Sequence, residues 1–121
     1  MNLSKAQLRK LMPRRNKYNV STKERRTADG IVFASRKEME RYKSLKALQS
    51  AGHCWFIRQP IFDTGGGTTY RADFLVVWTT RMPSGTQVSV VVEDTKGHKT
   101  SAYIRAKKQV EALYPIKIKE T

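Results

Sequence analysis

The stretch VVVEDTKGHK, which spans Val90–Lys99, joins three valines to a row of charged side chains. Valine favours β-strands, so the apolar half predicts a buried strand. Glu93, Asp94 and Lys96 then continue along the same strand. Because side chains alternate across a strand, Asp94 and Lys96 share one face, while Glu93 and Thr95 share the other. The strand is therefore expected to end with a carboxylate and an ammonium on one face.

A second acid stands near the head of the preceding apolar run, YRADFLVVW, Tyr70–Trp78. The intervening Thr79–Thr86 has the composition of a hairpin turn, which would pair this run with a strand over Gln87–Lys96. The pairing brings Asp73 close to Asp94. Two carboxylates in a partly desolvated place repel each other unless a cation lies between them. A hard divalent ion bound by oxygen resolves the conflict, and Mg²⁺ is the expected one.

A helix is predicted to begin at Ser35 and to run to about Ala51. Glu38 follows Ser35 at the spacing of a capping box, in which each side chain satisfies the other residue's free backbone N–H. At about 100° per residue, Glu38 also lies on the apolar side of this helix, whereas Glu40 points to water. Glu38 therefore has two open roles, as a helix cap or as a ligand near the ion.

The remaining elements complete the order αβββαβ. The pattern predicts a strand at Cys54–Gln59, a flexible connection at Asp63–Gly67, a second helix that begins at Thr100 or Ser101 and ends before Pro115, and a last strand from Ile116 to Lys119. The predicted core includes Trp55, Trp78 and the inward positions Tyr103, Ala106, Val110 and Leu113 of the second helix.

Composition indicates one basic globular domain. The chain has 121 residues, with 24 lysines and arginines against 10 acids and a net charge of +14. Such a charge favours a polyanionic partner, of which nucleic acid is the commonest. No apolar run is long enough to span a bilayer, and the first residues lack the pattern of a secretory signal. The single Cys54 fits a reducing cytoplasm, so we expect a cytoplasmic protein without a membrane partner.

Basic residues crowd the first part of the chain, and we expect residues 1–28 to form a basic arm that grips phosphates, with a solvated tail as the alternative. Three further residues near the second helix are candidates for phosphate contact, with plain solvent exposure as the alternative. The predicted DNA contacts are Arg14, Arg15, Lys17, Arg25, Arg26, His98, Lys99 and Lys107.

Four short motifs occur in a consistent order along residues 29–119. They are F-x-S-x-x-E at Phe33–Glu38, Q-P at Gln59-Pro60, A-D-F at Ala72–Phe74 and E-D-x-K-G at Glu93–Gly97. In this combination the chain resembles the PD-(D/E)XK nuclease superfamily, and more closely a group of small phage proteins. Ala72 stands where many members carry proline. The resemblance implies a restriction-endonuclease-like αβββαβ core over residues 29–121, with a mixed central sheet flanked by helices.

The same resemblance implies a metal-dependent endonuclease site. Asp73 and Asp94 would hold Mg²⁺, or Mn²⁺ as a substitute, with the carbonyl of Thr95 as a further ligand. Glu38 would bind a second ion or a water on the first, and Lys96 would orient the attacking water. Cleavage would leave 5′-phosphate and 3′-hydroxyl ends. The catalytic set is thus expected to be Glu38, Asp73, Asp94 and Lys96.

The sequence contains no base-reading module such as a helix-turn-helix, which favours recognition of shape and backbone charge. Small phage members of the superfamily include Holliday-junction resolvases, so branched DNA is the first expected substrate. Two cuts on a twofold-symmetric junction imply a homodimer. Nicking of duplex DNA, and a non-catalytic basic nucleic-acid-binding protein that keeps the fold, are the alternatives. A phage protein of this kind would act in the host cytoplasm.

Overall fold

The computed structural model describes residues 4–7, 21–95 and 99–121 of the chain. The chain forms two compact units, Met1–Met39 and Glu40–Thr121. In the described part, no helix is both long enough and apolar enough to cross a membrane. Five residues with predicted roles lie outside the described ranges, namely Arg14, Arg15, Lys17, Lys96 and His98.

In the first unit, a 3-10 turn η1 (Lys23–Arg26) leads into a small hairpin of β1 (Thr27–Ala28) and β2 (Ile31–Val32). The dipeptide Asp29-Gly30 is typical of a turn, and it forms the turn of this hairpin. Both residues have positive φ, at 51° and 75°, as a two-residue turn between right-twisted strands requires. The end of the predicted arm is therefore folded.

The predicted first helix is confirmed as α2 (Arg36–Ser50). The Ser35 hydroxyl accepts a hydrogen bond from the backbone N–H of Glu38 at 3.1 Å, as one half of a capping box does. Glu38 is buried, with 4% of its surface exposed, and Glu40 is exposed, as the helical spacing predicted. The helix ends at Ser50, and Gly52 just beyond it has a φ of 84°, which suits glycine.

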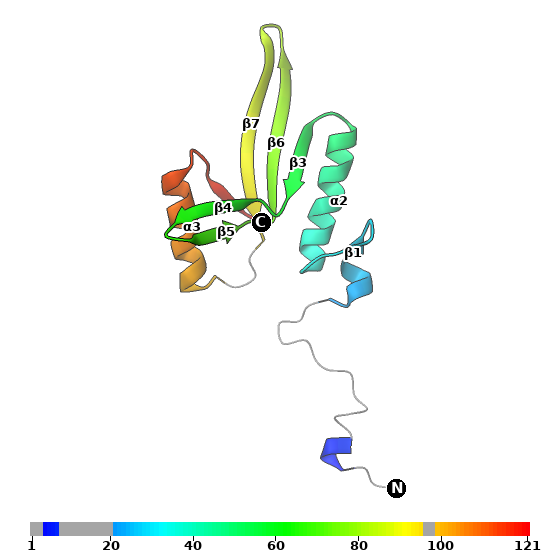
Figure 1. The fold of residues 1–121 in the computed structure, drawn as a ribbon. Helices are drawn as coiled ribbons and strands as arrows, with labels where there is room; N and C mark the ends of the chain where they lie inside the picture. Colours follow the sequence, from blue (N-terminus) through cyan, green and yellow to red (C-terminus); the bar gives the residue numbers. More distant parts are fainter. Residues whose placement is uncertain (1–3, 8–20, 96–98) are drawn as a thin grey trace. The chain divides into compact units, whose positions relative to one another are not determined.

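The second unit is built on a four-stranded sheet in the order β3-β6-β7-β8 (Figure 1). Its strands are β3 (Cys54–Arg58), β6 (Phe74–Met82), β7 (Gly85–Asp94) and β8 (Ile118–Glu120). The first three are antiparallel, and β8 runs parallel to β7 after the crossover helix α3 (Ser101–Leu113). The protein is therefore a mixed α/β protein with a mixed sheet.

The predicted hairpin turn at Thr79–Thr86 is wrong in length. The strands continue through it and pair residue by residue up to Met82↔Gly85, so only Pro83 and Ser84 form the loop. Threonine favours strands, and Thr79, Thr80 and Thr86 lie within this region. The result is a long β6–β7 hairpin.

The predicted single strand Tyr70–Trp78 is also wrong, because it is two strands. Tyr70 and Arg71 belong to β5 (Thr68–Arg71), which pairs with β4 (Ile61–Gly65) in a separate hairpin. Three consecutive glycines with positive φ close this hairpin, where the sequence had predicted a flexible connection. The strand structure is interrupted at Ala72-Asp73, between β5 and β6.

Two faces of the sheet are covered differently. On one face, the ring of Phe56 packs against Tyr42 of α2 at 5.9 Å and against Phe74 at 6.0 Å, both edge to face. The other face holds a cluster under α3 that consists of Tyr70, Ala72, Val92, Tyr103, Val110 and Ile118. Helix α3 is capped by Thr100, whose hydroxyl accepts from the N–H of Tyr103 at 3.1 Å, as predicted.

Two predicted core residues lie at the surface. Trp55 is 50% exposed and Leu113 is 59% exposed. Trp55 shares its side of the sheet with Val77 and Val90, its neighbours in register, and Val90 is also largely exposed. The sheet continues past the area that α3 covers, which a helical or strand pattern alone does not reveal.

Candidate functional site

The candidate site lies where β6 begins and β7 ends. Their last paired residues at this end are Phe74 and Glu93, so one further step places Asp73 opposite Asp94. The predicted pairing of the two strands is thus confirmed. Asp73 lies in the interruption between β5 and β6, directly before β6, and Asp94 is the final residue of β7.

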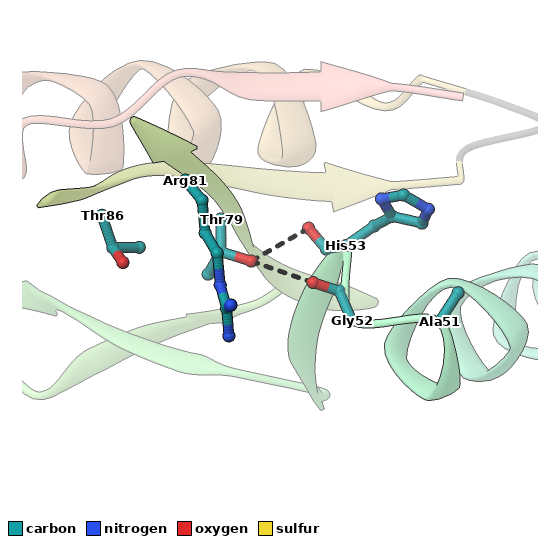
Figure 2. A pocket seen from close by; sticks show the side chains of 6 residues that line it. All are labelled: Ala51, Gly52, His53, Thr79, Arg81 and Thr86. Carbon is teal, nitrogen blue, oxygen red and sulfur yellow. Dashed lines mark hydrogen bonds between the residues drawn. The ribbon is translucent and has the colours of Figure 1, made fainter. Parts of the chain in front are cut away.

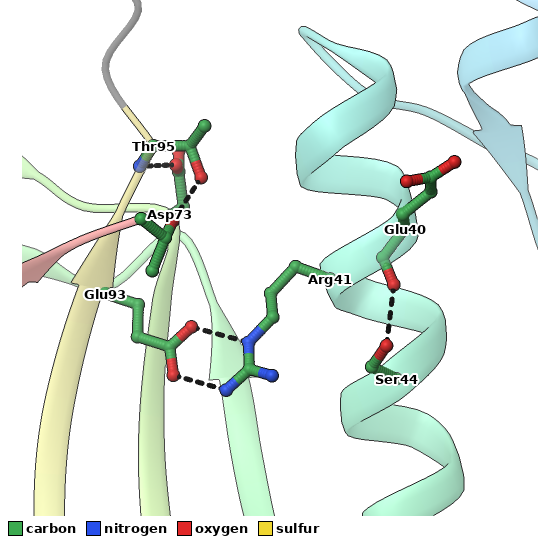
Figure 3. Close-up of polar contacts among 7 residues, drawn as sticks. Glu40, Arg41, Ser44, Asp73, Glu93 and Thr95 are labelled. Atoms are coloured by element: carbon green, nitrogen blue, oxygen red, sulfur yellow. Dashed lines mark hydrogen bonds and ion pairs between the residues drawn. The ribbon is translucent and has the colours of Figure 1, made fainter.

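Asp73 is held from both sides of its backbone. Its N–H donates to the carbonyl of Glu93 at 3.1 Å, and its carbonyl accepts from the N–H of Gln59 at 2.8 Å. Its carboxylate Oδ2 accepts a hydrogen bond from the backbone N–H of Thr95 at 2.6 Å (Figure 3). The carboxylate of Asp73 therefore reaches across to the residue that follows Asp94.

The Gln59-Pro60 motif is hydrogen-bonded to Ala72-Asp73, the interruption between β5 and β6. Gln59 has a φ of 50°, which a residue with a side chain adopts at a cost of about 1 kcal/mol or more. The carbonyl of Pro60 accepts from the N–H of Ala72 at 3.1 Å. The motif therefore brackets Ala72-Asp73 with main-chain hydrogen bonds.

Asp94 is completely buried on the α3 face, where the phenol of Tyr70 donates a hydrogen bond to its Oδ2. Burial, and next the hydrogen bond to Asp94, raise the pKa of Tyr70 well above its usual value. Tyr70 therefore stays a protonated donor at neutral pH. The C-terminal segment adds support, because the N–H of Thr121 donates to the Asp94 carbonyl at 3.1 Å and its hydroxyl lies 2.7 Å from that of Thr95.

Glu93 points to the opposite face, as strand alternation predicted. It is 1% exposed and forms a two-pronged ion pair with Arg41 of α2, with Nε–Oε1 and Nη2–Oε2 distances of 2.7 Å (Figure 3). The hydrogen bond to Glu93 raises the pKa of Arg41. The negative charge of Glu93 is therefore matched by the cation of Arg41.

A further ionic cluster lies beside Asp94 on β8. Glu120 is the register partner of Asp94, and its carboxylate contacts the ammonium groups of Lys107 at 2.8 Å and Lys99 at 2.5 Å. The hydrogen bond from Lys107, followed by that from Lys99, lowers the pKa of Glu120 to about 2. Burial raises the pKa of the neighbouring Tyr103 to about 12. Phosphate contact by Lys99 and Lys107 stays a prediction, and a phosphate would compete there with Glu120.

The donor chemistry suits Mg²⁺, which binds through one or two carboxylates and keeps several waters. Asp73 and Asp94 supply two carboxylates, and the carbonyl of Thr95 is a neighbouring oxygen. Within the ranges that the structure describes, no group of three or more His, Cys, Asp or Glu side chains is arranged to hold a metal. Glu38 belongs to the first unit, in the first turn of α2. Its part in the site rests on the resemblance.

Sequence reasoning missed three residues of this region, Arg41, Tyr70 and Glu120. A signal for Arg41 was present, because it lies about 40° from the buried Leu45 around the helix and so sits beside the apolar face. A charged side chain there calls for a buried acid as partner. Tyr70 and Glu120 carried no such signal, since their contacts depend on the β4–β5 hairpin and on the register of β8.

Fold and contacts together define a mixed α/β protein with buried acids at one end of its central sheet. The chain matches, over residues 15–120, the model of a family described as protein of unknown function (DUF1064), and it belongs to that family. No curated protein matches the chain in sequence.

Proposed function

We propose that the protein is a metal-dependent DNA endonuclease that hydrolyses phosphodiester bonds. The observation that carries this proposal is the pair Asp73 and Asp94, which stand at the same end of two adjacent strands, each fixed by a hydrogen bond. Asp94 is fully buried and Asp73 is half-buried. Removing carboxylates from water is costly, and a bound cation is a common reason for it.

The order of elements supports a restriction-endonuclease-like core. Taken in sequence, α2, β3, β6, β7, α3 and β8 give αβββαβ, with the β4–β5 hairpin as an insertion. The sheet is mixed, because β8 alone is parallel to its neighbour. This is the arrangement that the PD-(D/E)XK resemblance implies.

Asp73, Asp94 and the carbonyl of Thr95 would hold Mg²⁺ or Mn²⁺. When bound, the ion would lower the pKa of a water and stabilise negative charge on the phosphate. The chain's own contribution is orientation: the N–H of Thr95 directs the carboxylate of Asp73, and the phenol of Tyr70 directs that of Asp94. Glu38 and Lys96 take the roles that the resemblance gives them.

The substrate we propose is branched DNA of the Holliday-junction type, cut by a homodimer. The net charge of +14 supports a polyanionic partner, and the absence of a base-reading module in the sequence favours recognition by shape. Nicking of duplex DNA is the nearest alternative. The rival from another class is a basic nucleic-acid-binding protein without catalysis.

The deciding experiment incubates the protein with four-way junction, flap, single-stranded and duplex DNA, with and without Mg²⁺. We expect Mg²⁺-dependent cleavage that is fastest on the junction, and none by the Asp73→Asn/Asp94→Asn variant. Calorimetry should show loss of Mg²⁺ binding in the same variant, with Glu40→Gln as the control. Equal Mg²⁺ affinity of Asp73→Asn/Asp94→Asn and Glu40→Gln would contradict the proposed metal site. DNA binding without any cleavage would favour the non-catalytic nucleic-acid-binding protein.

A further inference from the structure

The far end of the β6–β7 hairpin extends beyond the rest of the sheet. Strand β3 reaches only to the pair Cys54↔Trp78, whereas β6 and β7 continue to Met82↔Gly85 (Figure 1). Residues 80–87, which we name the ribbon, are therefore a two-stranded ladder without a third strand, and all are exposed. Because the two strands are paired up to the two-residue turn, the ribbon has a defined backbone conformation.

The chemistry of the ribbon suits a nucleic acid. It contains no aspartate or glutamate, and it offers four polar donors besides an exposed Met82 at the tip, namely Thr80, Ser84, Thr86 and Gln87. Arg81 is its one cation and contacts no carboxylate in the part of the chain that the structure describes. Arginine, hydroxyl and amide groups supply most contacts to phosphates and bases.

The base of the ribbon is anchored to the turn between α2 and β3. The N–H of Thr79 donates to the carbonyl of His53 at 3.1 Å, and its hydroxyl donates to the carbonyl of Gly52 at 3.3 Å (Figure 2). A depression of about 420 Å³ lies here, and Arg81 and Thr86 line it together with the turn. Arg81 and Thr86 are register partners, so both side chains lie on the same face.

The ribbon has the dimensions of a groove-binding element. Two paired strands lie about 4.8 Å apart, and three residue pairs at about 3.3 Å each extend the ribbon by roughly 10 Å. The major groove of B-DNA is about 12 Å wide and 8.5 Å deep and admits a two-stranded ribbon, whereas the minor groove is about 6 Å wide. The ribbon therefore fits the major groove.

We propose that residues 80–87 enter the major groove of duplex DNA, with Arg81 and Thr86 binding a backbone phosphate over the depression and Met82-Pro83 directed to the groove. This inference rests on the proposed function for the choice of DNA as the ligand. It assigns binding to a part of the molecule at the opposite end of the strands from Asp73 and Asp94.

Two variants of the full chain test the ribbon. The first replaces residues 81–86 with Asn-Gly and so joins Thr80 to Gln87. This pair lies two positions along each strand from the native closing pair, so the alternation of faces and hydrogen bonds is kept. The second is Arg81→Ala, matched by Arg105→Ala, which removes one charge from the exposed face of α3. Thermal melting checks that all variants fold.

Binding to duplex and junction DNA is measured by fluorescence anisotropy with Ca²⁺, across a range of salt concentrations. We expect the shortened ribbon to bind at least about tenfold more weakly, and Arg81→Ala to lower the salt slope by about 0.9, the value for one phosphate contact. Arg105→Ala should leave the slope unchanged. Methyl green, which occupies the major groove, should displace the wild type, and a minor-groove ligand should not.

Unchanged affinity of the shortened variant, or equal slope losses in Arg81→Ala and Arg105→Ala, would overturn the inference, and the ribbon would then be a surface for another class of partner. Cleavage with Mg²⁺ is scored separately. If the protein cleaves DNA and the shortened variant keeps full DNA affinity, the ribbon inference is wrong and the proposed nuclease function stands. If DNA affinity depends on the ribbon but no DNA is cleaved, the proposed nuclease function is wrong and the ribbon inference stands.

Discussion

The two ends of the β6–β7 hairpin differ in every property that bears on function. At one end, Asp73, Glu93 and Asp94 are gathered, and the last two are almost fully buried. At the other end, the ribbon has no acid at all and is exposed throughout. The same two strands therefore carry a candidate reaction centre at one end and a candidate DNA contact at the other.

The neighbours of the strands explain this difference. At the acid end, Arg41 of α2 covers Glu93, and Tyr70 and β8 cover Asp94, so each carboxylate is desolvated and oriented. Beyond the pair Cys54↔Trp78 the ribbon has no third strand beside it. At the buried acid end, electrostatic interactions of the carboxylates are stronger, because they take place away from water. Exposure lets the ribbon meet a large partner.

The largest effect we expect is on catalysis at the acid end. Asp94→Asn should lower the cleavage rate at saturating DNA by about a hundredfold or more, comparable to the loss of a charge-stabilising group in other active sites. The amide oxygen can still accept from Tyr70, so the melting temperature should stay close to that of the wild type. Single-turnover cleavage measures the rate.

Glu40→Gln, on the exposed side of α2, is the control for Asp94→Asn and should be silent. Glu38→Gln gives a second reading: a cap tolerates glutamine, whereas a ligand of the ion does not. If Asp94→Asn weakened DNA binding and left the rate unchanged, the division of labour between the two ends would be wrong.

The next effect concerns stability at the same end. Glu93→Gln breaks the ion pair with Arg41 and leaves a guanidinium without its buried partner. Loss of one member of a buried pair costs about 3–5 kcal/mol, and the 28% exposure of the Arg41 side chain reduces this to about 2–3 kcal/mol. Urea denaturation measures the free energy of unfolding.

Arg41→Met/Glu93→Met should recover much of that stability, because apolar residues of similar size replace the pair without stranding a charge. Cleavage by folded Glu93→Gln at saturating DNA should be close to wild type. A rate loss as large as that of Asp94→Asn, with unchanged stability, would make Glu93 a ligand of the ion and would contradict its assignment to the α2 face.

Much of the fold could be predicted from local pattern. The cap at Ser35, the turn at Asp29-Gly30 and the cap at Thr100 depend on residues three positions apart or less, so sequence defines them directly. The β4–β5 hairpin could not be predicted in the same way. Its glycines are compatible with a loose connection, and only pairing with Thr68–Arg71 makes them a tight turn.

The candidate site likewise has one part that local sequence predicts and another part that it does not. The opposition of Asp73 and Asp94 follows from a hairpin, and a hairpin preserves register even when its turn is placed too broadly. The ion pair of Arg41, 52 positions from Glu93, and the contact of Glu120 with Lys107 depend on how a helix and a crossover strand pack. Such contacts are set by tertiary structure, which no local spacing encodes.

A smaller effect is expected from Tyr70→Phe, which removes the hydroxyl that donates to Asp94. An acceptor left without this partner in the interior costs about 1–2 kcal/mol of stability. Loss of this donor also leaves the carboxylate of Asp94 less firmly oriented, so the cleavage rate at saturating DNA should fall. Urea denaturation and single-turnover cleavage measure these effects.

Tyr114→Phe is the matched control, because the Tyr114 hydroxyl donates to the carbonyl of Asp63 at an exposed position. It should cost less stability and leave the cleavage rate unchanged. Identical losses in both variants would mean that Tyr70 contributes only packing, and the acid end would then be less finely oriented than we infer.

The smallest effect is expected at Glu120, where the two lysines are held. The pKa of Glu120 is lowered from its usual 4.5 to about 2, so the ion pairs stabilise the fold above pH 4.5 and lose this contribution as the pH falls toward 2. The stability difference between wild type and Glu120→Gln should be small at neutral pH, because the pairs are partly exposed and solvent screens them. It should vanish near pH 2 in acid titrations of unfolding.

Glu120→Gln should also release Lys99 and Lys107 for phosphate and so steepen the salt dependence of DNA binding, by about 0.9 for each new contact. Glu111→Gln removes an equal charge from a carboxylate that lies 4.0 Å from Lys107, and it controls for general repulsion of DNA. A steeper slope for Glu120→Gln alone would show that Glu120 restrains two DNA contacts at the acid end. Equal slopes for both variants would leave the ribbon as the stronger candidate for DNA binding in the second unit.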